Sequence, residues 1–385
     1  MKKIFAKIHL WLSVPLGIVV TIVCLSGAVL VFESEITRAL HQNLYSVKAP
    51  AGAQPLSPSQ LVARIGEQMP DSLHIVSLQL SADNNETCIA SFRETGRGQL
   101  SIDPYTGRVN GWTESTVFFL TMRKIHRWLL DPPASKGGKS IGKVVVGIST
   151  MGLVLIIISG LVLWVPRNRK ALRNRLRVSS ACGLHRFWYD CHVSLGFYAA
   201  ILLSVMALTG LTWSFGWYRT AAYAIFGGAQ RSVALQENIP RKDGSGHDGR
   251  VAGSVHGGVR NRVDAHTFDY AVWDEVLAQL VSHYPAYSTI ALTMTEAQVG
   301  RHSYMRRVDT VVFDPLSGKI VEITRYEDTP VQQRLRGWFY ALHTGSWGGK
   351  WTKVLYLIVA LIGASLPLTG YYLWWKRNGR RLANR

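Results

Sequence analysis

Four histidines stand at matched positions in this chain of 385 residues, each paired with an apolar run that ends in Ser-Gly or Thr-Gly. The pairs are His9 with Ser26-Gly27, His192 with Thr209-Gly210, His126 with Ser159-Gly160, and His343 with Thr369-Gly370. In the first two cases the histidine lies eighteen residues before the glycine. Imidazole is the commonest metal ligand among side chains. The recurrence therefore predicts a paired cofactor site, with no side-chain acid or base needed for its chemistry.

Four segments must position these histidines, because they are the only long apolar runs. Residues 10–32, 144–165, 193–215 and 354–375 contain no Asp, Glu, Lys or Arg. Each has the roughly 20 residues that a helix needs to cross a bilayer. The sequence thus predicts four transmembrane helices, the first of them an uncleaved span rather than a signal peptide.

The positions of the basic residues behind the net charge of +19 indicate the membrane topology of the chain. Residues 1–9, 166–186 and 376–385 carry three, seven and five Lys or Arg and no acidic residue. Four spans place these segments on one side of the membrane, and the positive-inside rule makes that side cytoplasmic. This distribution argues against a nucleic-acid partner and favours the lipid bilayer and its anionic headgroups. We expect a multi-pass membrane protein with both termini in the cytoplasm.

The intervening segments predict two exported α+β domains. Each carries an alternating strand, an Asp-Pro-x-Thr/Ser-Gly turn and a second strand, at residues 99–109 and 310–321. Proline presets such a turn and glycine supplies a positive φ, so a structural role is expected for Asp103 and Asp314. Helices are expected at 58–68 and 272–283, and a flexible loop at 229–261.

A short amphipathic helix bearing a histidine follows each hairpin, around His126 and around His343. The expected fold is a membrane α-helical bundle of four transmembrane helices with a two-fold pseudo-repeat and two α+β periplasmic domains. The expected boundaries are as follows: 1–32 N-terminus and first span, 33–143 first periplasmic domain with its histidine segment, 144–165 second span, 166–192 basic loop, 193–215 third span, 216–353 second periplasmic domain with its histidine segment, and 354–385 fourth span and basic tail.

The two units, the Asp-Pro-x-Thr/Ser-Gly hairpins and the aromatic-rich histidine segments resemble the PepSY-associated transmembrane family over nearly the whole chain. The resemblance implies that both periplasmic domains are PepSY-like. It also implies a haem protein that reduces ferric siderophores at the periplasmic side of the inner membrane. Members with other roles share these motifs, so the resemblance fixes the architecture better than the substrate.

Histidines suit haem b, which needs one or two imidazoles on its iron and apolar walls between helices. His9 and His192 lie at the cytoplasmic ends of the first and third spans, where they would ligate one haem, and His126 with His343 would ligate a second near the periplasm. His185 is two helical turns from His192 and shares its face, so it is an alternative to His9.

The expected function is that of a haem-dependent metal oxidoreductase, which passes electrons from a membrane quinol or a separate reductase to a periplasmic ferric siderophore. Siderophore oxygens prefer hard Fe(III), so reduction releases the metal as Fe(II). One alternative is a siderophore or metal permease, although the spans lack the charged residues that transporters place at mid-membrane. Another is a cofactor-free scaffold whose PepSY-like domains bind a periplasmic peptidase, which leaves the matched histidines without a role.

Overall fold

The computed structural model describes residues 1–95, 98–135, 138–180, 183–227, 267–301 and 307–383. The expected loop 229–261 lies outside the described residues. The chain forms two compact units, which are taken separately below. The helical unit comprises Met1–Glu33, Thr116–Arg231 and Val331–Arg385, and the sheet unit comprises Ser34–Ser115 and Ser232–Pro330.

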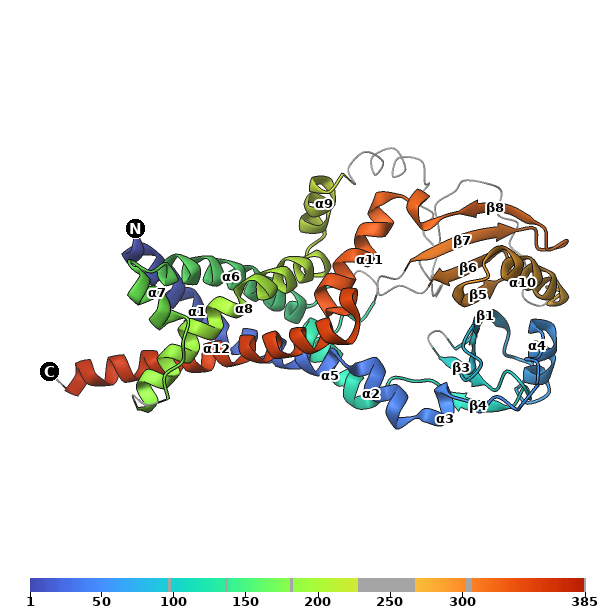
Figure 1. Cartoon of the computed structure of the whole chain (residues 1–385), viewed down its shortest axis with the longest axis horizontal. Coiled ribbons are helices and arrows are strands. Elements are labelled where there is room, and N and C mark those ends of the chain that lie inside the picture. Colours follow the sequence, from blue (N-terminus) through green and yellow to red (C-terminus); the bar gives the residue numbers. More distant parts are fainter. Residues whose placement is uncertain (96–97, 136–137, 181–182, 228–266, 302–306, 384–385) are drawn as a thin grey trace. The chain divides into compact units, whose positions relative to one another are not determined.

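The helical unit is built almost entirely of α-helices (Figure 1). Its elements are α1 (Lys2–Leu30), α5 (Val117–Trp128), α6 (Ile141–Trp164), α7 (Arg169–Arg175), α8 (Leu184–Ser214), α9 (Gly216–Ile225), α11 (Val331–Thr344), the short 3-10 helix η3 (Ser346–Gly348) and α12 (Gly349–Ala383). Four of them, α1, α6, α8 and α12, contain apolar stretches long enough to cross a membrane, as the uncharged runs predict. The helices extend beyond those runs at several ends, so His9 lies two turns inside α1 rather than in a frayed terminus.

The four long helices form one bundle, in which α1 and α8 each pack against both α6 and α12. Lys2 at the start of α1 donates a hydrogen bond to the carbonyl of Val165, just after α6 (Nζ to O, 2.8 Å). Both chain termini lie at this end of the bundle (Figure 1). We call it the basic end, because the segments rich in Lys and Arg meet there, and we call the opposite end the far end.

Many small residues are buried inside the bundle, and many large apolar residues are exposed on its outer surface. Ala199 and Ala360 are fully buried, whereas Ile18 and Ile201 are 63% and 75% exposed. Helices associate closely in lipid through small residues, because lipid chains solvate large aliphatic side chains as well as a protein core does. This inversion of the soluble pattern fits a bundle surrounded by lipid.

The sheet unit holds one antiparallel sheet of eight strands, in the order β4-β3-β2-β1-β5-β6-β7-β8. The strands are β1 (Ile75–Ser81), β2 (Cys88–Phe92), β3 (Gln99–Ile102), β4 (Val109–Trp112), β5 (Tyr287–Thr293), β6 (Glu296–Arg301), β7 (Val308–Phe313) and β8 (Ile320–Thr324). The helices are α2 (Glu33–Leu40), α3 (Gln42–Tyr45), α4 (Pro58–Gly66), α10 (Ala271–His283) and the 3-10 helix η2 (Tyr326–Asp328).

The two segments of the sheet unit, which the sequence predicts to be separate domains, share this sheet. Strand β1 of the first segment pairs with β5 of the second, with Leu78 opposite Leu292 and Leu80 opposite Ile290. Each four-stranded half would otherwise expose an edge of unpaired N–H and C=O groups at β1 and at β5. Pairing the two strands removes both edges and joins the segments into one body.

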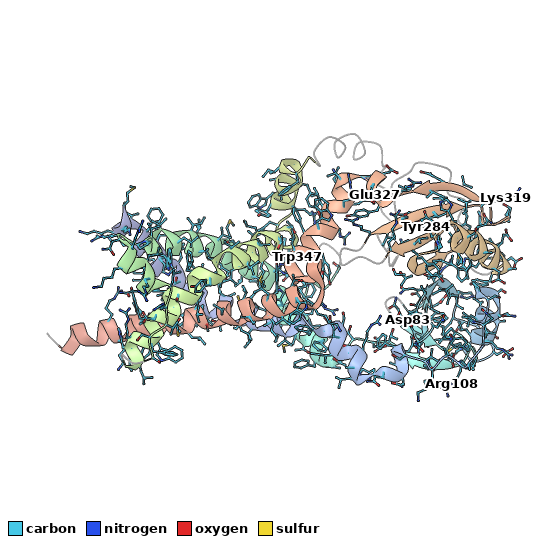
Figure 2. The ribbon with its side chains drawn as sticks, viewed as in Figure 1. Asp83, Arg108, Tyr284, Lys319, Glu327 and Trp347 are labelled. Carbon is cyan, nitrogen blue, oxygen red and sulfur yellow. The ribbon has the colours of Figure 1, made fainter. Side chains whose placement is uncertain are left out.

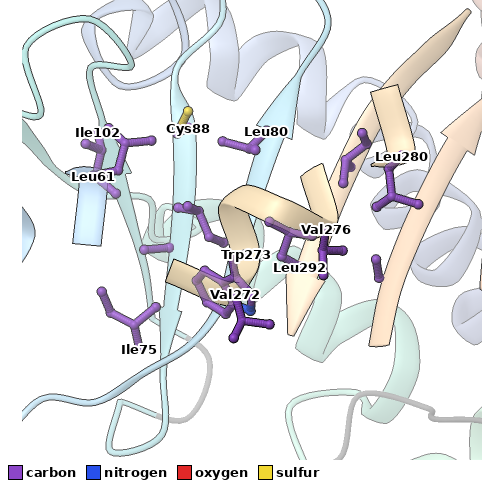
Figure 3. Packing of buried hydrophobic residues seen from close by; sticks show 14 of the residues in the cluster. Leu61, Ile75, Leu80, Cys88, Ile102, Val272, Trp273, Val276, Leu280 and Leu292 are labelled. Atoms are coloured by element: carbon purple, nitrogen blue, oxygen red, sulfur yellow. The ribbon is translucent and has the colours of Figure 1, made fainter. Parts of the chain in front are cut away.

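One continuous apolar core lies between the sheet and its two main helices (Figure 3). Helix α4 contributes Leu61 and α10 contributes Trp273, and both side chains are fully buried against strand residues such as Leu292. Trp273 keeps its indole N–H satisfied by donating to the carbonyl of Thr293 (2.8 Å). The predicted helices at 58–68 and 272–283 are therefore confirmed as α4 and α10, within a few residues.

The two predicted turns are confirmed and share their geometry. Gly107 and Gly318 have φ values of +71° and +67°, and each donates its N–H to the carbonyl of the turn's aspartate at 2.9 Å. The carboxylates of Asp103 and Asp314 accept backbone N–H groups within their own turns, which accounts for both aspartates structurally. Arg108 and Lys319, labelled in Figure 2, occupy the same position directly after the two glycines.

Asp274 of α10 links the two segments of the sheet unit, because its carboxylate caps the start of α4. Oδ1 accepts the backbone N–H of Ser59 (2.8 Å), and Oδ2 accepts the hydroxyls of Ser57 (2.9 Å) and Ser59 (2.5 Å). Hydrogen bonds to a charged group contribute about 1.5–3 kcal/mol each, less where solvent competes.

In Asp274→Asn we expect amide hydrogen exchange in Pro58–Gly66 to accelerate roughly tenfold. The exposed neighbour variant Glu275→Gln is the control, and equal exchange in both variants would contradict the assigned cap.

Candidate functional site

The basic end of the bundle brings together His9 of α1 and His192 of α8. Their ring centroids lie 6.2 Å apart and the ring planes are nearly perpendicular, at 88°. The residues are 183 positions apart in sequence, and they meet because α1 and α8 flank the same two helices. We call them the basic-end pair.

The far end brings together the other two matched histidines. His126 of α5 and His343 of α11 have ring centroids 6.0 Å apart and an interplanar angle of 54°. Both helices are the short histidine helices that the sequence predicts, with α5 packed against α1 and α6, and α11 against α8. We call His126 and His343 the far-end pair.

Each ring rests on the glycine of a Ser/Thr-Gly pair in a neighbouring helix. A Cβ added to the glycine would lie close to Cε1 of the histidine: 2.9 Å from His126 at Gly27, 3.0 Å from His343 at Gly210, 3.2 Å from His9 at Gly160, and 3.5 Å from His192 at Gly370. The glycines therefore provide seats for imidazoles. In sequence a histidine and its seat are far apart, so the seats for His9, His192, His126 and His343 could not be assigned from spacing.

Nδ1 of each ring is held by the helix that seats it. In three cases Nδ1 donates to the backbone carbonyl four residues before the seat glycine: Val23 for His126 (2.9 Å), Met206 for His343 (2.9 Å) and Ile156 for His9 (3.1 Å). Leu366 holds the corresponding position for His192. A carbonyl oxygen can only accept, so Nδ1 carries the proton. A neutral ring then keeps its lone pair on Nε2, the nitrogen left to bind a metal.

The hydroxyl before each seat glycine adds a second acceptor. Thr369 Oγ1 lies 2.9 Å from Nδ1 of His192, and Thr209 Oγ1 lies 3.2 Å from Nδ1 of His343. Both hydroxyls donate their own proton to a carbonyl of their own helix, so toward the imidazole they can only accept. Ser159 and Ser26 stand in the same relation to His9 and His126, at 3.2 and 3.5 Å. Such partners fix the tautomer and orientation of metal-binding histidines.

The far-end histidines lie outside the four spans, in helices with their own anchors. Thr116 caps the start of α5, and Arg123 in that helix forms an ion pair with Glu33. Burial lowers the pKa of both His126 and His343, to about 4 for His343. Both rings are consequently neutral near pH 7, which is the protonation state that binds metal.

The two pairs lie near opposite ends of the spans. His9 and Gly27, the seat of His126, are both in α1 and are eighteen residues apart, which is a rise of about 27 Å. The same interval separates His192 from Gly210 in α8. The hydrocarbon core of a bilayer is about 30 Å thick, so the interval between the two pairs is close to the thickness of that layer.

A cavity of about 750 Å³ surrounds the basic-end pair. This volume lies within the range of about 300–1,000 Å³ that is typical of pockets for organic ligands. Its walls are mainly apolar, and Gly160 and Gly196 leave room along them. His185 also lines the cavity, but its exposed ring lies beside Tyr372. The structure thus pairs His9 with His192 and leaves His185 at the rim.

The donor set suits haem better than a bare metal ion. Within the described ranges, no group of three or more His, Cys, Asp or Glu side chains is placed to hold a metal. Two imidazoles are too few for a bare ion, whereas a porphyrin brings four nitrogens of its own. Imidazole nitrogens bind divalent metals at about 2.0–2.1 Å, so rings on opposite sides of one ion have centroids about 6 Å apart. Both pairs have this separation.

The sequence singles out the four histidines, but it indicates only a membrane-interface anchor for Trp164 and a basic-loop charge for Arg175; both side chains also line the cavity. The indole Nε1 of Trp164 is buried without a hydrogen-bond partner in the part of the chain that the structure describes. Trp164 stands in the Leu-Trp-Val-Pro-Arg exit of its run, where membrane-interface anchoring is the ordinary interpretation. That pattern alone could not distinguish an anchor from a cavity residue.

The helical bundle with its two imidazole pairs defines a multi-pass membrane protein. The sequence matches the family described as PepSY-associated TM region over residues 6–377. The match covers almost the entire chain, and the protein belongs to this family. A search of curated proteins gave no match.

Proposed function

We propose that this protein is a haem-binding electron-transfer protein of the bacterial inner membrane that reduces a ferric siderophore at the periplasmic side. The observation that carries the proposal is the pair of neighbouring imidazoles at each end of the bundle, with Nδ1 held and Nε2 left as the metal-binding nitrogen. Haem b, when bound, supplies a carrier that accepts and releases one electron at a time.

The residues of this chain bind, orient and shield that group. The four histidines would bind the haem iron, the Ser/Thr-Gly seats would fix the tautomer of their rings, and the apolar cavity walls would exclude water. The basic end faces the cytoplasm by the positive-inside rule, so His126 and His343 lie toward the periplasm. One electron converts each chelated Fe(III) to Fe(II), which the hard siderophore oxygens hold less tightly. A membrane quinol or a separate reductase is the proposed donor.

The test is an optical reduced-minus-oxidised spectrum of the purified protein, together with the amount of haem per polypeptide. We expect about two haems with two imidazole ligands each. In proteoliposomes supplied with a quinol, Fe(II) released from an external ferric siderophore should appear in a chelator assay and depend on the donor. A colourless protein after expression with ample haem would refute the proposal, and siderophore uptake without a donor would support a permease instead.

Thr369→Val tests the hydroxyl that holds His192. The substitution keeps the shape of the side chain but removes the oxygen that accepts from Nδ1 at 2.9 Å. Loss of such a partner typically weakens binding by about 10–100-fold. We therefore expect faster haem loss from the basic-end site and a higher reduction potential there, because the imidazole becomes a weaker electron donor. Thr369→Ser retains the hydroxyl and should behave as the unmodified protein; identical values for Val and Ser would contradict this role.

A further inference from the structure

The Lys and Arg side chains that line the cavity all lie at the basic end of the bundle. Deep in the bundle the cavity is lined by apolar and small residues such as Val20, Leu203 and Gly363. At the basic end its lining includes Arg175, Lys376 and Arg377, and no carboxylate is among its described lining residues. An apolar cavity with a cationic rim suits a flat apolar molecule that carries anionic groups on one edge.

Arg175 is set apart from the other cations of α7 by its geometry. Arg169, Lys170 and Arg173 are exposed, whereas Arg175 is half-buried. Its guanidinium turns back onto the end of α6 and donates to the carbonyls of Leu163 (2.8 Å) and Trp164. Both bonds use Nη1, so further donors of the planar five-donor group are left for a ligand. A fixed guanidinium is well suited to bind a carboxylate through two hydrogen bonds.

Trp164 places a second donor at the same wall. Its ring stacks on Phe197, with centroids 3.6 Å apart and planes 7° from parallel, so the side chain is firmly held. Its buried Nε1 has no acceptor among the described residues. A buried N–H without a partner costs about 1–3 kcal/mol, and a ligand oxygen bound at this wall would remove that cost.

We infer that the basic-end cavity binds haem with its two carboxylates at the cytoplasmic rim, held by Arg175 and Trp164 with Lys376 and Arg377 beside them. The inference rests on the proposed function and adds an orientation to it. A lipid phosphate shares the anionic chemistry that this rim would recognise. The carboxylate is favoured because Arg175 and Trp164 border the same cavity as the imidazole pair, whereas a headgroup needs only the exposed cations.

The test compares haem b with its dimethyl ester, which has the same macrocycle but no charged carboxylates. The full-length chain is produced without haem and carries His343→Ala, so that the basic-end site is measured alone. Optical titration then gives the dissociation constants of both compounds. Charge-assisted hydrogen bonds contribute about 1.5–3 kcal/mol, so we expect the free acid to bind at least about tenfold more tightly than the ester.

Arg175→Gln should bring this ratio close to one, and Trp164→Phe, which keeps the stack on Phe197, should reduce it by a smaller factor. Arg175→Lys keeps the charge and should retain part of the preference. Arg173→Gln, an exposed neighbour in α7, should leave the ratio unchanged.

The measurements are made in phosphatidylcholine nanodiscs and repeated with phosphatidylglycerol. A ratio near one in the Arg175 protein, or a preference that Arg175→Gln does not alter, overturns the carboxylate site while the proposed function stands. A preference that appears only without phosphatidylglycerol assigns the rim to lipid and also overturns it. Failure of both compounds to bind overturns both proposals.

Discussion

Replacement of one histidine in a pair by alanine is expected to remove about one haem per polypeptide, because each proposed site has only two protein ligands. His192→Ala should empty the basic-end site, and His126→Ala should empty the far-end site. The two changes should be independent, since the pairs are separated by most of the membrane thickness. The double variant is expected to be colourless. Haem content and the reduced-minus-oxidised spectrum measure the outcome.

His185→Ala is the matched control. This histidine lies in the same helix as His192 and lines the same cavity, but it is exposed and lies beside Tyr372 rather than facing His9. The variant should keep both haems. Unchanged spectra and stoichiometry in His126→Ala and His192→Ala would refute the ligand assignment. A loss of haem in His185→Ala with retention in His9→Ala would show that His185, rather than His9, is the partner of His192.

Local patterns in the sequence were sufficient for the spans, the turns and the identity of the four histidines. Uncharged runs locate α1, α6, α8 and α12, because a lipid-facing helix cannot tolerate charges along its length. The Asp-Pro-x-Thr/Ser-Gly signature locates the turns because only a positive φ closes them, and Gly107 and Gly318 have that φ. In each case, the determining interaction lies within a few residues of the signal.

Features that depend on distant contacts were not predictable in the same way. Strands β1 and β5 pair although they lie more than 200 residues apart, and nothing in the sequence of either strand indicates its partner. The seats are a similar case. The Ser/Thr-Gly pairs were visible as markers at the ends of apolar runs, but His126 rests on Gly27 and not on the Ser159-Gly160 that follows it in sequence. The histidine and its seat are brought together only by the packing of helices.

The seats differ in how closely the glycine approaches the histidine ring. Alanine substitutions are therefore expected to act differently at the two ends of the bundle. An alanine methyl at Gly27 or Gly210 would lie 2.9 or 3.0 Å from Cε1 of the histidine, too close for carbon atoms, so the ring must move. At Gly370 the corresponding distance to His192 is 3.5 Å, an ordinary van der Waals contact. We expect Gly27→Ala and Gly210→Ala each to lose about one haem, or to release it at least tenfold faster, since ligands misplaced by a few tenths of an ångström no longer face one another. Gly370→Ala should keep both haems.

This series is informative because the three substitutions act alike on the helices and differently on the rings. Alanine favours a helix over glycine by about 0.5–1 kcal/mol, so a loss of haem from Gly27→Ala or Gly210→Ala cannot be attributed to a weakened helix. Haem per polypeptide and the rate of haem transfer to apomyoglobin provide the measurements, and unchanged helical content by circular dichroism shows that the bundle is intact. If Gly370→Ala lost as much haem as Gly27→Ala, close packing between helices in general, rather than a seat for one imidazole, would be the role of these glycines.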